Sequence, residues 1–167
     1  DVNFAENQPD LLRIGMQFAV NRELKNRKWY GLGPTENYAD RNAGVWLGRF
    51  ENSIDESLFR YVDPQESSTV TKVREAELFG EDFPSLKISA LDKNYFELST
   101  YPCLPEDIEQ ATNTHQLPKR DFNVVNVSAV NAGLGGITSW GALPIKEARI
   151  TSGKSYKFSF SISGEND

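Results

Sequence analysis

The chain has 167 residues and a formal net charge of −6, with one cysteine and one histidine. This length suffices for one domain with a substantial core, so folding does not require a disulfide or a metal. A single cysteine excludes an internal disulfide and a multi-cysteine metal cage, and a single histidine excludes a histidine-cluster metal site within the chain.

The charge pattern also limits the partners. Basic residues are scattered along an acidic chain, which predicts no nucleic-acid partner and favours neutral or cationic ones. No apolar run approaches the roughly 18 residues of a membrane helix, so no membrane partner is expected. The first residues contain neither a basic nor an apolar signal region, so any signal peptide lies outside this sequence. The compartment is left open between cytoplasm and periplasm.

Alternating apolar residues predict strands along most of the chain. The first strand is predicted over 12–20, with one face formed by Leu12, Ile14, Met16, Phe18 and Val20. The same alternation recurs over 44–51, 86–90 and 155–162. Residues 122–130 carry valines on both faces, which is typical of a central strand.

Helix signals are scarce. One short helix is predicted from Pro105 to Ala111, where a proline in the first turn is followed by two acidic residues. Many short strands separated by Gly, Pro, Asn and Asp favour an all-β antiparallel sandwich. We expect residues 1–167 to form a single domain.

A turn-rich segment with a distinctive order of residues runs from Trp29 to Arg41. Its marked positions are Trp29, Gly31, Gly33, Pro34, Glu36, Tyr38, Asp40 and Arg41. Arg41 can take a carboxylate in a bidentate fork, which would hold the turn from Gly31 to Pro34. A second segment carries Tyr61, Pro64, Gln65, Glu66 and Arg74.

A third segment, Gly133 to Gly141, contains four glycines and ends next to a large aromatic ring. The glycines allow positive φ and a close approach to a ligand, so Trp140 is a candidate sugar platform. The alternative is a turn with a tryptophan packed in the core. A phosphate-binding loop is not favoured, because no helix pattern follows, Pro144 comes eight residues after Gly136, and no βαβ unit surrounds the segment. Trp29 and Trp46 are expected to pack in the core or on a strand face.

Together the three segments resemble the C-terminal domain, also called the small chain, of bacterial β-galactosidases of glycoside hydrolase family 2. The resemblance extends from Leu12 to the last predicted strand. The chain departs from the family pattern in three places. Ser67-Ser68 replaces the usual Asn-Gly, so a different local turn is expected, and Ile137, Thr138 and Ser128 stand where aspartates are common.

The resemblance implies a large antiparallel sandwich of the galactose mutarotase type, of which this chain is the later portion. The two catalytic glutamates of the family lie in a separate barrel of about 250 residues, so this chain is expected to be non-catalytic alone. Trp140 would form a wall beside the bound sugar, on a loop supported by Gly133, Gly135, Gly136 and Ser139. The implied partners are a β-galactoside, the barrel of the same polypeptide and further copies of the parent enzyme. No cofactor is expected in the chain, since the Mg and Na ions common in the family bind outside it.

Two other functions remain open. A stand-alone carbohydrate-binding module would combine Trp140 with Tyr30 or Tyr38 as an autonomous platform. A purely structural domain would contribute only oligomer contacts. Mutarotase activity is disfavoured, because it needs positioned acid and base groups and the chain has only His115.

Overall fold

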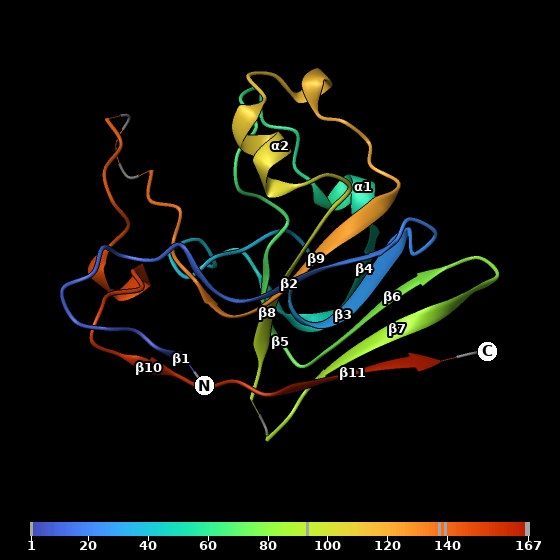
Figure 1. Cartoon of the computed structure of the whole chain (residues 1–167), viewed down its shortest axis with the longest axis horizontal. Helices are drawn as coiled ribbons and strands as arrows, with labels where there is room; N and C mark the ends of the chain where they lie inside the picture. Colours follow the sequence, from blue (N-terminus) through green and yellow to red (C-terminus); the bar gives the residue numbers. More distant parts are fainter. Residues whose placement is uncertain (1, 93, 137, 139, 166–167) are drawn as a thin grey trace.

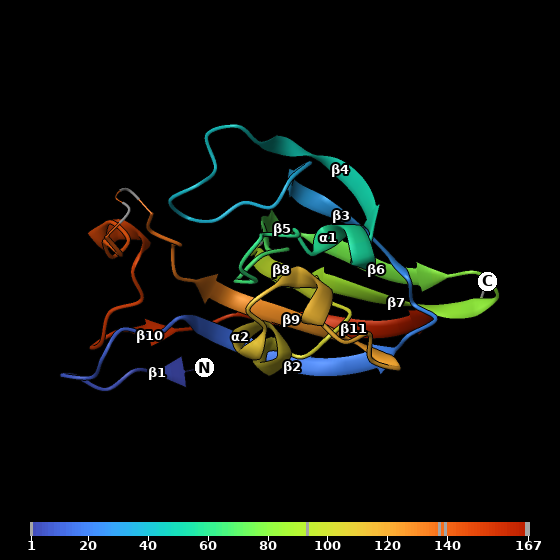
Figure 2. The same cartoon turned by 90° about the horizontal axis from the view of Figure 1, so that it is seen from above.

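The computed structural model describes residues 2–92, 94–136, 138 and 140–165. It consists of two main antiparallel sheets and a small third one (Figures 1 and 2). The five-stranded sheet has the order β11-β7-β6-β3-β4. Its strands, in that order, are Phe160–Glu165, Phe83–Ala90, Glu75–Gly80, Asn26–Gly33 and Trp46–Ser53.

The four-stranded sheet has the order β2-β9-β8-β5. Its strands, in that order, are Arg13–Asn21, Phe122–Asn131, Phe96–Tyr101 and Val70–Val73. The third sheet pairs β1 (Val2–Asn3) with β10 (Ser155–Tyr156). These sheets confirm the all-β antiparallel prediction.

The main core lies between the two larger sheets. Trp29 and Ile88 extend into it from the five-stranded sheet, and Leu98 and Val127 from the four-stranded one. All four are 2% exposed or less. Alternation produces this arrangement, because every second side chain of a strand points to the same face.

A second apolar cluster lies where α2 (Pro105–Gln110) covers β9 (Figure 2). Ile108 of the helix packs there with Tyr101, Cys103 and Val124. The helix confirms the predicted segment to within one residue at its end. Burial raises the pKa of the Cys103 thiol to about 11, so this cysteine is an inert core residue at neutral pH.

The other helical turns are short. Helix α1 (Ile54–Ser57) begins with a capping box between Ser53 and Glu56. Two 3-10 turns cover Thr114–Gln116 and Lys146–Ala148. Across the described residues, no helix combines the length and the apolar character that a membrane crossing requires.

Two local predictions were wrong. The side chains of Leu12 and Met16 are exposed, because β2 is an edge strand and Leu12 precedes it. The predicted strand over 155–162 is divided between β10 and β11, which belong to different sheets. Trp46 lies on a strand face, the second of its two predicted positions: it is 60% exposed and touches the ring of Phe50 edge-on.

Candidate functional site

Two of the segments singled out in the sequence meet at one end of the sandwich. The turn between β3 and β4 and the Gly-rich segment after β9 lie at the same end in both views (Figures 1 and 2). Asp40 connects them directly. Its Oδ1 accepts a hydrogen bond from the backbone N–H of Leu134 (3.0 Å), and its Oδ2 accepts one from Gly135 (2.8 Å).

Glycine is required at several positions of this loop, for different structural reasons. A β-carbon at position 133 would lie 2.5 Å from the Asp40 carboxylate, so only glycine allows this approach. Gly135 and Gly136 have φ of 74° and 78°, in the left-handed region that glycine adopts without strain. These three predicted support residues therefore shape the loop. Ser139, the fourth, lies outside the described residues.

Trp140 is 91% exposed, which excludes the alternative of a tryptophan packed in this chain's core. Its backbone N–H approaches Oγ1 of Thr138 at 3.4 Å, a weak contact that gives Thr138 the acceptor position of an Asx-type turn. Leu143 and Ile145, close behind in sequence, are 66% and 48% exposed. The loop thus presents apolar side chains to its surroundings.

Glu36 and Arg41 form a three-membered network with Tyr61. Arg41 donates from Nη2 to Glu36 and from Nη1 to the Tyr61 hydroxyl (3.1 Å). The Tyr61 hydroxyl in turn donates to Oε1 of Glu36 (2.7 Å). The predicted bidentate fork was therefore wrong, since only one guanidinium nitrogen reaches the carboxylate. The network connects the turn after β3 to the second sequence segment.

The turn from Gly31 to Pro34 is held instead by Asn37, which the sequence analysis did not single out. Nδ2 of Asn37 donates to the carbonyl oxygens of Leu32 (3.3 Å) and Thr35 (2.9 Å). Nε1 of Trp29 donates to the same Leu32 oxygen (3.0 Å). An asparagine three residues after a Gly-Pro pair is a signal for such a turn.

Gly31 and Gly33 are required for close packing. A β-carbon at position 31 would lie 3.0 Å from the Cα of Val73, and one at position 33 would lie 2.5 Å from the Phe50 ring. Pro34 follows Gly33 through a cis peptide bond.

Tyr38 is also structural, because it is 1% exposed. The Arg41 guanidinium lies 5.4 Å from its ring centroid. Burial and the nearby carboxylate of Glu66 raise the pKa of the Tyr38 phenol far above its ordinary value, so it stays neutral.

Glu66 and Glu97 anchor the base of the Gly-rich loop. Nη2 of Arg13 donates to both carboxylate oxygens of Glu66 (2.9 and 3.0 Å), and Nε of Arg13 donates to Oδ1 of Asn131 (2.8 Å). The backbone N–H of Asn131 donates to Oε2 of Glu97 (2.7 Å). Glu97 faces Ser128 across the β8–β9 pair.

Burial raises the pKa of Glu97 to about 7, although the Asn131 N–H and the charge of Arg13 act to lower it. Glu97 thus titrates near neutral pH at the base of the loop. Nothing in the sequence signalled this.

A cavity of about 850 Å³ opens at the same end of the sandwich. Its charged lining residues are Arg27, Glu36, Asp40, Arg41 and Glu56. Apolar and aromatic residues at its edge include Phe59, Tyr61 and Ile145. Asp40 lines this cavity and also accepts the hydrogen bonds from Leu134 and Gly135. The cavity and the loop that carries Trp140 are therefore adjacent.

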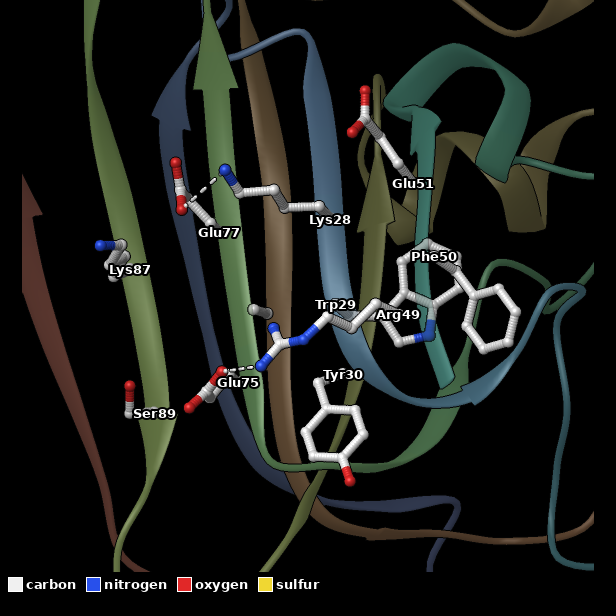
Figure 3. A pocket seen from close by; sticks show the side chains of 11 residues that line it. Lys28, Trp29, Tyr30, Arg49, Phe50, Glu51, Glu75, Glu77, Lys87 and Ser89 are labelled. Atoms are coloured by element: carbon white, nitrogen blue, oxygen red, sulfur yellow. Dashed lines mark hydrogen bonds and ion pairs between the residues drawn. The ribbon is translucent and has the colours of Figure 1, made fainter. Parts of the chain in front are cut away.

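A second cleft, of about 400 Å³, lies on the five-stranded sheet (Figure 3). Lys28 pairs with Glu77 (3.1 Å), and Arg49 reaches across from β4 to Glu75 (3.2 Å). The guanidinium groups of Arg49 and Arg74 lie 5.0 and 5.4 Å from the ring centroid of Tyr30. Tyr30 is thus already engaged by two cations, and opposite charges pair on this surface.

The described residues contain no group of three or more His, Cys, Asp or Glu arranged to hold a metal ion. His115 is exposed in the first 3-10 turn, where its Nδ1 lies 2.8 Å from Oδ1 of Asn113. The site therefore consists of ion pairs, turn-forming glycines and exposed aromatic residues.

The fold is an antiparallel β-sandwich, and one end of it carries a cavity and a loop with exposed apolar side chains. Residues 1–162 match the protein family described as beta galactosidase small chain, and the chain belongs to this family. It is 33% identical to a β-galactosidase of Halalkalibacterium halodurans over 94% of the chain, and 34% identical to one of Streptococcus thermophilus over 92%. A β-galactosidase of Priestia megaterium is 32% identical over 95%. The chain spans about 15% of the length of each of these relatives.

Proposed function

We propose that this chain is the C-terminal sandwich of a family 2 β-galactosidase and that it supplies Trp140 to the sugar site of the parent enzyme. The parent would hydrolyse terminal β-D-galactose residues, with both catalytic glutamates in a barrel outside these residues. The supporting observation is Trp140 itself. It is 91% exposed on a loop whose base is fixed by the Asp40 carboxylate.

This combination fits a binding role better than a packing role in this chain. An exposed indole loses apolar hydration when a sugar face covers it. Two charge-assisted hydrogen bonds fix the base of the loop before the ligand arrives, which lowers the entropic cost of ordering the loop on binding. The remaining sandwich surface would pack against the barrel and against other copies of the parent.

An autonomous sugar-binding module would need Tyr30 or Tyr38 as a second aromatic platform beside Trp140, and the structure disfavours both. Tyr38 is buried, and Tyr30 is flanked by Arg49 and Arg74. Neither offers a second open aromatic face beside Trp140.

Two measurements test the proposal. The 167-residue chain should not hydrolyse a chromogenic β-galactoside, while the full-length parent should. Titration of the chain with galactose and lactose should show no binding in the millimolar range. Turnover by the purified chain that disappears on mutation of one of its own acids contradicts the proposal, and millimolar sugar binding favours the module.

A further inference from the structure

The cavity at the loop end contains one charge that differs from the others. Arg27 is 1% exposed and extends from β3 into the floor of the cavity. Its Nε donates to Oδ1 of Asn52 (2.9 Å), and its Nη1 donates to the carbonyl oxygen (2.9 Å) and hydroxyl (3.2 Å) of Ser68. These are neutral acceptors, and none of the contacts among the described residues uses Nη2.

Each carboxylate of the cavity, in contrast, already has donors. Glu36 accepts from Arg41, from the Tyr61 hydroxyl and from the backbone N–H of Ser68 (2.8 Å). Asp40 accepts from two backbone N–H groups of the Gly-rich loop. Glu56 accepts from the backbone N–H (3.1 Å) and the hydroxyl (2.9 Å) of Ser53.

Arg27 is therefore a buried cation without a hydrogen-bonded counter-ion in the described part of the chain. Burial lowers the pKa of its guanidinium to about 10, so it is still charged at neutral pH. A buried charge is normally paired, because removal from water is costly unless an opposite charge compensates it. The stacking of Arg27 5.0 Å over the Trp29 ring and the nearby charge of Glu36, which makes no hydrogen bond to Arg27, compensate only part of this cost.

The edge of the cavity has the composition of a protein interface. Phe59 is 57% exposed and lies 4.5 Å, centroid to centroid, from the ring of Tyr61. Ile145 is 48% exposed and belongs to the segment that carries Trp140. Aromatic residues around a buried arginine are typical of the central, tightly packed part of an interface.

We propose that this cavity receives an aspartate or glutamate side chain from a part of the same polypeptide outside residues 1–167, and that Arg27 pairs with its carboxylate. This inference rests on the proposed function, in which the chain is one domain of a longer enzyme. It fits the finding that the chain spans about 15% of the length of its relatives. Arg27 would orient the face that carries Trp140 against the remainder of the enzyme.

Carbodiimide coupling tests the pairing in the full-length protein. The variant Arg27→Lys places an amine in the cavity, and the reagent joins an amine to a carboxylate that touches it. Peptide mass spectrometry should then find position 27 joined to an acid outside residues 1–167. The ion pair of Lys28 with Glu77, at 3.1 Å, is the internal control for the reaction.

A link from position 27 only to Glu36 or Glu56, a link to another copy's cavity, or no link while the Lys28 control reacts would overturn the inference. Turnover of a β-galactoside by the same preparation reports on the proposed function separately. An active enzyme without the expected link therefore refutes the pairing alone.

A second measurement needs no variant. Phe59 and Trp46 are almost equally exposed in this chain, at 57% and 60%. Hydroxyl-radical labelling of the wild-type full-length protein, corrected for the reactivity of each side-chain type, should find Phe59 protected several-fold relative to urea-unfolded protein. Labelling of Phe59 at the rate that 57% exposure predicts would show that the cavity is uncovered and would contradict the docking.

Discussion

Asp40 shows how one side chain can position a loop that is distant in sequence. The carboxylate contacts Leu134 and Gly135, which lie 94 and 95 residues further along the chain. Hydrogen bonds to a charged acceptor are about twice as strong as neutral ones. The base of the loop that carries Trp140 is therefore held by a residue of the other motif.

Replacing Asp40 by alanine should loosen the Gly-rich loop with little effect on the core. Two amides lose a charged acceptor, at a cost of about 1–3 kcal/mol for the loop. Hydrogen exchange should speed up at Leu134 and Gly135 and stay unchanged at core amides such as Val125. The matched control is Asp40→Asn, which keeps one acceptor oxygen and should give an intermediate effect. Unchanged exchange at both loop amides would show that Asp40 does not hold the loop.

Glu97 makes stability depend on pH. Its pKa is raised to about 7 in the folded chain, above the ordinary 4.5. The folded state therefore binds more protons than the unfolded state between these values, and the free energy of unfolding falls as pH rises from about 4.5 to 7. Arg13 and the Asn131 N–H limit the effect to at most a few kcal/mol.

The variant Glu97→Gln should remove this contribution while leaving an acceptor for Asn131. Denaturant unfolding should find the variant more stable than wild type at pH 8 and no more stable than wild type at pH 4.5. The control Glu75→Gln changes an exposed acid on the other sheet and should leave the pH profile unchanged. A wild-type profile identical to that of Glu97→Gln would contradict the raised pKa.

At the level of elements, the turn before β5 adopts a glycine-like conformation without a glycine. Ser68 has φ of 70°, in the left-handed region that glycine adopts without strain. The Ser68 hydroxyl donates to the Thr100 carbonyl oxygen (2.9 Å) and accepts from the Thr100 N–H (3.1 Å). Arg27 contacts the same hydroxyl at 3.2 Å. These contacts offset the strain of a side chain in the left-handed region.

Two substitutions separate strain from hydrogen bonding at this turn. Ser68→Ala keeps the strained φ and loses the buried contacts, so it should cost about 1–3 kcal/mol. Ser68→Gly also loses the contacts but relieves roughly 1 kcal/mol of backbone strain. Thermal unfolding should therefore rank wild type above Ser68→Gly, and Ser68→Gly above Ser68→Ala. The reverse order of the two variants would show that φ strain is negligible here.

Sequence periodicity identified strands but not their neighbours. The valines of 122–130 correctly predicted the central strand β9, because burial on both faces leaves a continuous apolar pattern. The alternation over 155–162 did not reveal its division, since Tyr156 pairs with Val2 while Phe160 pairs with Ala90. Pairing depends on residues far apart in the chain, which a local pattern does not contain.

The same limit applies to the site. The glycines were recognisable as a loop, because the φ angles that they allow are a local property. The exposure of Trp140 was not, since the sequence left open a tryptophan packed in the core. The contacts of Asp40, the buried charge of Arg27 and the raised pKa of Glu97 each depend on several strands meeting at one end. These features therefore required the folded structure.

At the scale of the whole molecule, the role of Trp140 is decided by measuring how its substitution changes protein stability and, separately, sugar binding. Its side chain is 91% exposed, so truncation should remove almost no packing from this chain. Tryptophans in a core behave oppositely, and their truncation costs about 3–5 kcal/mol. Trp29, at 2% exposed, is the matched control for that behaviour.

Trp140→Ala in the full-length enzyme should weaken sugar binding about tenfold, chiefly as a higher KM. If a sugar covers roughly 50–60 Å² of the indole face, burial at about 25 cal/mol per Å² contributes about 1.5 kcal/mol, which is about one decade in a binding constant. An interaction of equal strength in ground and transition states raises KM and leaves kcat unchanged. Steady-state kinetics and thermal unfolding should be measured on the same preparation. A variant with wild-type KM that melts many degrees lower would assign Trp140 to packing between domains and remove it from the sugar site.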